Sequence, residues 1–194
     1  MNLPMGEIAM FSAALAAAGV VAGILAGLFG IGGGAILVPV FYQVFGLVGV
    51  DEAVRMHLSV GTSLAIIVPT SLRSFRAHYL RGAVDMDLLR SFVIAVPTGV
   101  VLASLVAAHV SSSGLRAIFA VIACLVGIRL LLNRQTWHLG TEITGNPARS
   151  LVGALIGFFS TVMGIGGGVL NNTFMTLFNR PMHQAVATSS GVGV

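Results

Sequence analysis

The amino-acid sequence predicts an all-α, polytopic helical membrane protein with two internal repeats and glycine-broken helices. Of its 194 residues, 56% are hydrophobic and only 8% are charged, whereas soluble domains carry about 25% charged residues. The mean hydropathy is +0.99, and stretches such as 88–110 and 115–132 are apolar for long enough to cross about 30 Å of hydrocarbon. A glycine-rich run also occurs twice, each time inside an apolar stretch.

The first half of the chain, 1–133, is expected to form the first membrane repeat. Its first apolar stretch is interpreted as a retained helix, because Glu7 is acidic and a cleaved signal peptide needs a basic start. The expected order begins with an apolar stretch over 8–28, a glycine run at 30–34 and a short apolar piece over 35–48. A polar turn at 50–52 and a span over 54–72 follow. An arginine-bearing loop over 73–90 then leads to the two long spans.

A polar linker over 134–149 leads to the second repeat, 150–194. This repeat begins with an apolar stretch over 150–163, which is followed by the second glycine run at 164–168. The remaining elements are an apolar piece over 169–178, a turn at 179–181 and a helix that starts near His183. A helix that stops at Val194 would reach only about 18 Å at 1.5 Å per residue. We therefore expect the second repeat to be truncated.

The arginines predict the orientation in a cell (inner) membrane. The loops 73–90 and 134–149 carry arginines and are separated by two crossings, so they face the same side. Cytoplasmic loops are enriched in arginine and lysine, and we expect both loops to be cytoplasmic. The turns at 50–52 and 111–114 would then face outward. The side of the N-terminus, and whether the repeats are inverted or parallel, is left open.

Two motifs recur in the same order in each half, which indicates a duplication. The glycine-rich run is the first. The second is a Met-His pair followed by a Thr-Ser pair: Met56-His57 and Thr62-Ser63 in the first half, Met182-His183 and Thr188-Ser189 in the second. Two further glycines in each half keep the spacing of the runs, so that Gly19, Gly23 and Gly30 match Gly153, Gly157 and Gly164.

With these motifs, the chain resembles the TauE/SafE sulfite exporter family, also called the DUF81-type membrane transporter permeases. The resemblance rests on the two glycine runs, Pro39 after the first run, and the Thr-Ser pairs, and it covers nearly the whole chain. It implies a multi-helix inner-membrane carrier, often one assigned to the export of sulfite or small organosulfonates. The second half departs from the family pattern, because Asn171-Asn172-Thr173 stand where the first half has Leu37-Val38-Pro39.

The glycine runs are the candidate binding site for a small anion. A broken helix leaves backbone N–H groups and a positive dipole end unpartnered, and glycine lets a ligand approach the backbone. The alternative is that the glycines only permit close helix crossing, which is the favoured interpretation for Gly19, Gly23, Gly153 and Gly157. The candidate substrate-binding residues are Gly30, Gly32, Gly33, Gly34, Thr62, Ser63, Gly164, Gly166, Gly167, Gly168, Asn171, Asn172, Thr188 and Ser189.

Other residue types argue against rival functions. No carboxylate lies within a predicted span, where proton and sodium pumps usually keep one. No metal-binding cluster or catalytic pair stands out, so no enzyme activity, cofactor or metal is predicted. His57 and His183 are interpreted mainly as helix-end residues, and Arg55 and Arg180 as interfacial anchors. The partners expected are a small anion, the lipid bilayer and a second copy of the chain, with no nucleic acid. The alternatives are a passive anion channel and a non-transporting membrane assembly subunit.

Overall fold

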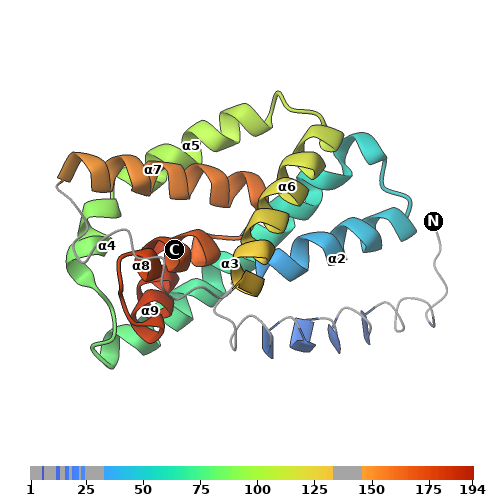
Figure 1. The fold of residues 1–194 in the computed structure, drawn as a ribbon. Helices are drawn as coiled ribbons and strands as arrows, with labels where there is room; N and C mark the ends of the chain where they lie inside the picture. The colour runs from blue at the N-terminus through green and yellow to red at the C-terminus, as the bar shows by residue number, and fades with distance from the viewer. Residues whose placement is uncertain are drawn as a thin grey trace.

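The structure is a computed structural model. It describes residues 33–132 and 146–194, together with residues 6, 12–13, 16–17, 19–21 and 23–24. Gly30, Gly32, most of the stretch 8–28 and most of the predicted linker lie outside the described residues. Within them the chain is helical and has no strand, which confirms the all-α prediction (Figure 1). The helices are α2 (Gly34–Leu47), α3 (Glu52–Leu80), α4 (Met86–Phe92), α5 (Ala95–Ala107), α6 (Ser112–Leu132), α7 (Asn146–Met163), α8 (Gly168–Leu177) and α9 (Met182–Val192).

Helix α3 is longer than the sequence predicts. Its start is set by Asp51, whose carboxylate accepts a hydrogen bond from the Ala53 N–H at 2.8 Å, as an N-cap does. The predicted loop over 73–90 is wrong in its first part, because α3 continues to Leu80 and includes Arg73 and Arg76. An arginine on a membrane helix can extend its head group toward the interface, so charge alone does not end the helix.

The predicted span over 88–110 is not one straight helix. It consists of α4 and α5, which meet at a bend of 43° around Val93 and Ile94. Pro97 explains the position of this bend, because a proline ring clashes with the carbonyl four residues earlier and offers no N–H to it. The predicted linker is also too long, since α7 begins at Asn146. Pro147 fits there, because the first helical turn needs no N–H donor.

Apolar helices dominate the described residues, although few reach full membrane length. By length and composition, α3 can cross a membrane, and α4 with α5 forms a second candidate if the bent pair is one span. The described parts of α2, α6 and α7 form shorter apolar helices. Only 17% of the apolar window of α3 is buried inside the protein. Most of this window therefore lies on the surface of the described part of the chain.

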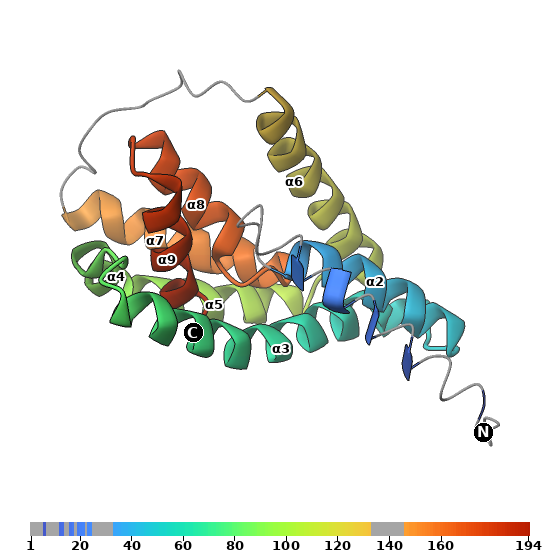
Figure 2. The same ribbon diagram turned by 90° about the horizontal axis from the view of Figure 1, so that it is seen from below.

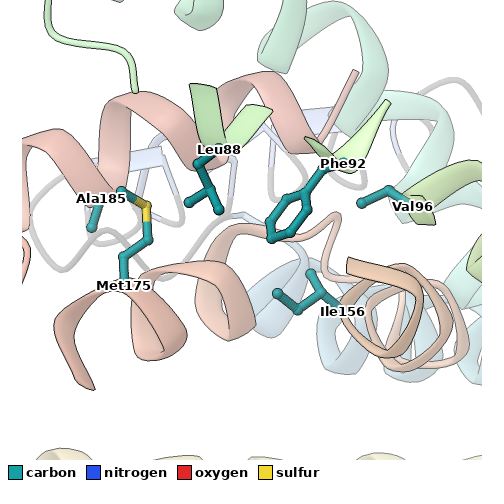
Figure 3. Close-up of a cluster of buried hydrophobic side chains, with 6 residues drawn as sticks. All are labelled: Leu88, Phe92, Val96, Ile156, Met175 and Ala185. Carbon is teal, nitrogen blue, oxygen red and sulfur yellow. The ribbon is translucent and has the colours of Figure 1, made fainter. Parts of the chain in front are cut away.

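Close helix packing places the core between the two halves of the chain. Helices α5 and α7 lie side by side (Figure 1), and a Cβ added at Gly99 or Gly157 would collide with the backbone of the other helix. Gly153 likewise faces Phe92. The packing interpretation of Gly153 and Gly157 therefore agrees with the structure. One buried cluster joins α4, α5, α7, α8 and α9 through Leu88, Phe92, Val96, Ile156, Met175 and Ala185 (Figure 3).

Candidate functional site

The second glycine run forms a sharp connection between α7 and α8. Helix α7 ends at Met163 and α8 begins at Gly168. Between them Gly164, Gly166 and Gly167 have φ values of 68°, 70° and 73°. These values lie in the left-handed region, which glycine enters without the steric cost that a side chain adds. The run is therefore a break that only glycine accommodates easily.

This connection packs against the start of α2 and the middle of α3. A Cβ added at Gly34 would collide with the carbonyl oxygen of Gly164 and with Ile165 Cα. On the other side, the Ser63 hydroxyl donates a 2.7 Å hydrogen bond to the Gly164 carbonyl oxygen. Ser63 lies near the midpoint of the 29-residue helix α3. The second break thus lies at mid-depth of the longest helix and contacts the first residue of α2.

Helix α8 begins at the end of the second break, and α2 begins where Gly34 packs against that break. Gly33 is the N-cap of α2 and Gly167 is the N-cap of α8, and these two positions match in the sequence repeat. Among the described residues, no backbone carbonyl accepts from the N–H groups of Gly34, Ala35, Val169 and Leu170. The first N–H groups of a helix carry the positive end of its dipole. Two such ends therefore lie close together within the protein.

A buried polar cluster lies one turn into α8. Asn171 donates through Nδ2 to the Ser189 hydroxyl at 2.9 Å, and that hydroxyl donates to Asn172 Oδ1 at 2.5 Å. Asn171 is 0% exposed, Asn172 5% and Ser189 4%. The Oδ1 atom of Asn171 has no hydrogen-bond partner among the described residues. A buried polar atom without a partner costs free energy, so this oxygen is an unusual feature of the cluster.

The structure separates the members of the two Thr-Ser pairs. Ser63 and Ser189 face the glycine break and the asparagines, respectively. Thr188 is buried elsewhere, and its hydroxyl accepts a 2.9 Å hydrogen bond from the Asp85 N–H. Thr62 is half-buried on α3, without a hydrogen-bond partner in the described part of the chain. The structure brings together two groups of the predicted residues: Gly34, Ser63 and Gly164 at the second break, and Asn171, Asn172 and Ser189 between α8 and α9.

The histidines and arginines of the repeated motif occupy different environments. His57 Nε2 lies 3.1 Å from the Ala107 carbonyl oxygen and 3.0 Å from that of Val110, so it holds the end of α5 against α3. His183 is exposed. Arg55 donates to the Val50 carbonyl oxygen at 3.1 and 2.7 Å. None of these contacts involves the glycine break.

Sequence reasoning missed two features near the site. Ser160, one turn before the second break, has a buried hydroxyl without a partner among the described residues. Its signal was the polar pair Ser160-Thr161 near the end of an apolar stretch. Asp85 pairs with Arg180 at 3.8 Å and so connects the start of α4 to the turn after α8. The sequence held no signal for that pair, because the residues are far apart in the chain.

Comparison with known proteins identifies the family. The family model described as sulfite exporter TauE/SafE matches residues 15–194. The chain belongs to the TauE/SafE family. The TauE/SafE resemblance predicted from the motifs is thus confirmed, and the family is one of membrane transporters, so a membrane location is supported.

Curated relatives have matching names. The chain is 31% identical over 177 residues to a probable membrane transporter protein of Haemophilus influenzae, a match that covers 91% of this chain and 67% of the relative. It is 27% identical to one of Methanocaldococcus jannaschii, covering 90% and 65% of the two chains. It is 29% identical to YunE of Bacillus subtilis, a probable membrane transporter protein, covering 88% and 70%. The chain thus spans about two thirds of these relatives. No solved structure matches it significantly.

Proposed function

We propose that this TauE/SafE protein is a secondary transporter that exports a small anion, such as sulfite or an organosulfonate, and binds it at the paired glycine breaks. The contact between Gly34 at the start of α2 and Gly164 in the second break carries the proposal. It brings together two helix N-termini, each equivalent to roughly +0.5 elementary charge. Paired breaks in the two halves of a transporter are typical of a substrate site.

The chemistry of the surroundings favours an oxyanion. Backbone N–H groups at helix starts bind phosphate- and sulfate-like groups without a lysine or arginine. The depth of the site also fits, because Ser63 beside the break lies near the middle of α3. At the middle of a membrane few water molecules compete, so each N–H contact to an anion is strengthened.

The asparagine cluster can serve the same anion. A serine hydroxyl donates one hydrogen bond and accepts others, and the two ends of an asparagine amide are assigned from their hydrogen bonds. The relay from Asn171 through Ser189 to Asn172 can therefore also run in the opposite direction. In that arrangement the Asn171 NH₂ group occupies the position of the unpartnered Oδ1 atom. It would then donate to a bound oxyanion.

The orientation follows from the arginines. Arg81 and Arg90 lie at the end of the protein that holds the loop between α3 and α4, and Arg149 lies at the start of α7. Figure 1 shows α4 and the start of α7 at the same end. The positive-inside tendency makes this end cytoplasmic. The proposed location is the cell inner membrane, with the turn before α3 on the outer side.

Sulfite flux in proteoliposomes made with the full-length protein tests the proposal. Ser189→Ala removes the hydroxyl that joins the two asparagines, and Ser190→Ala is the control, because Ser190 donates only to the Ala187 carbonyl of its own helix. We expect Ser189→Ala to raise the half-saturating sulfite concentration about tenfold, which corresponds to about 1.4 kcal/mol. The control should change it little.

The same assay separates a carrier from a channel. A carrier gives saturable flux and counterflow, whereas flux that never saturates and shows no counterflow would favour a passive anion pore. If Ser189→Ala is still folded under the assay conditions, as judged by a cooperative unfolding transition in detergent, and transports like the control, the assignment of the polar cluster to the site is wrong. If no anion is transported by the unmodified protein, the transport proposal itself fails.

A further inference from the structure

The two half-helices leave the middle of the protein in opposite directions. Helix α2 begins at Gly34 against the second break, and its Tyr42 hydroxyl reaches Arg116 at 2.8 Å, near the α5–α6 turn. Helix α8 begins at the same break, and the turn that follows it places Arg180 beside Asp85 at the start of α4. Figure 2 shows α2 and α8 extending away from each other.

The helices that follow them also have opposite directions. The start of α3 lies at the α5–α6 turn, because the Met56 N–H donates to Ser112 Oγ at 3.2 Å. From there α3 runs to the α4 end. Helix α9 begins at the α4 end, and its contacts move back along α3 as it advances. Gly191 faces Phe75, and Gly193 faces Ser71.

The equivalent turns therefore lie at opposite ends of the protein. The turn between α2 and α3 is held by a 3.2 Å ion pair between Glu52 and Arg116. The turn between α8 and α9 is held by the Arg180–Asp85 pair. If the helix pair were repeated in parallel, both turns would lie at the same end of the protein. The ends are separated by the length of α3, which is about 43 Å for its 29 residues.

We infer that the two halves are inverted repeats, related by a two-fold axis that passes near the Gly34–Gly164 contact. The inversion rests on helix directions alone and does not depend on the substrate. The inversion also deepens the proposed function, and its consequence for transport rests on that proposed function. In inverted-repeat transporters, a site between the repeats opens to either surface when one repeat moves against the other. The two ion pairs would then close the site at opposite membrane surfaces.

Thiol labelling of single-cysteine variants in intact cells and inside-out vesicles tests the inversion. The starting protein is Cys124→Ala, since Cys124 is the one cysteine of the chain. Ala53→Cys reports the first turn and His183→Cys the second, and both positions are exposed. Ser113→Cys marks the α5–α6 turn, and Arg81→Cys marks the loop before α4. All four sites are exposed to an impermeant maleimide in the structure.

The expected result is that Ala53→Cys and Ser113→Cys react from one side of the membrane, and His183→Cys and Arg81→Cys from the other. Reaction of Ala53→Cys and His183→Cys from the same side would overturn the inversion. Val54→Cys and Met182→Cys, which are 48% and 46% exposed, replace either reporter if its variant does not accumulate. Because labelling does not require transport, an inverted result with no sulfite flux would reject the proposed function and leave the inversion standing.

Discussion

The relay between the buried asparagines and Ser189 makes a quantitative prediction about stability. Ser189→Ala removes the oxygen acceptor of the Asn171 amide, 2.9 Å away, and the donor to Asn172 Oδ1, 2.5 Å away. It leaves the Asn171 amide with its longer contact to the Met175 sulfur, at 3.6 Å. A buried polar group that loses its partner costs about 1–3 kcal/mol. Hydrogen bonds between membrane helices have measured lower, at about 0.6 kcal/mol on average. Because Ser189→Ala breaks two hydrogen bonds of buried groups at once, we expect it to destabilise the protein by about 1–3 kcal/mol.

The first half of the chain supplies the second variant of a double-mutant cycle. Leu37 stands at the repeat position that matches Asn171, so Asn171→Leu copies the apolar version of the site. In the double variant there is no Asn171 amide left without its serine partner. Ser189→Ala therefore lowers the free energy of unfolding less in the Asn171→Leu background than in the unmodified protein. We expect a coupling of about 0.5–2 kcal/mol between the two positions.

Equilibrium unfolding of the four proteins in detergent micelles measures this coupling. Ser190→Ala serves as the control, because its hydroxyl donates 2.6 Å to a carbonyl of the same helix and its loss strands no distant group. The reasoning would be refuted if the two single costs added to within about 0.3–0.5 kcal/mol, the usual limit for independent sites. In that case the cluster would be a set of neighbours without a shared network.

Two further predictions concern the glycine break. Gly34→Ala should destabilise the protein by about 1–3 kcal/mol or more, because the added Cβ collides with the backbone of the second break. The control is Gly127→Ala, whose added Cβ has no described atom within 4 Å. This control should be neutral or should stabilise the protein by up to about 1 kcal/mol. Equal unfolding midpoints for the two variants would contradict this. Ser63→Ala should cost about 1–3 kcal/mol, because it strands a buried carbonyl, and faster amide hydrogen exchange over 164–168 checks it; an unchanged exchange rate would count against the hydrogen bond.

Local sequence signals predicted the helix starts well and the helix ends less well. Helices α2 and α8 begin at the glycine runs because successive glycines disfavour a continuous helix. The arginines at 73 and 76 predict a loop, so the sequence ends α3 earlier than the structure does. Its actual stop coincides with Gly82, which has a φ of 65°. A glycine just beyond a helix is the common C-terminal signal, and it was present in the sequence.

The family and the candidate residues also came from the sequence, but their grouping did not. The repeated motifs indicated a TauE/SafE transporter, and the family match over 15–194 agrees with them. The repeated motif predicts the same substrate-binding role for Thr188 and Ser189. The structure separates them, because adjacent residues on a helix point about 100° apart. One hydroxyl therefore meets the asparagines, and the other meets the Asp85 backbone.

By itself, the sequence determined that the chain is helical and apolar, and it predicted a duplication, since composition and periodic motifs are local properties. The tertiary structure decided the direction in which each described helix runs. A helix shows the same apolar pattern whichever way it crosses a membrane, so the motifs could not distinguish inverted from parallel repeats. Only long-range contacts, such as Gly34 on Gly164 and Arg180 on Asp85, assign each helix a direction.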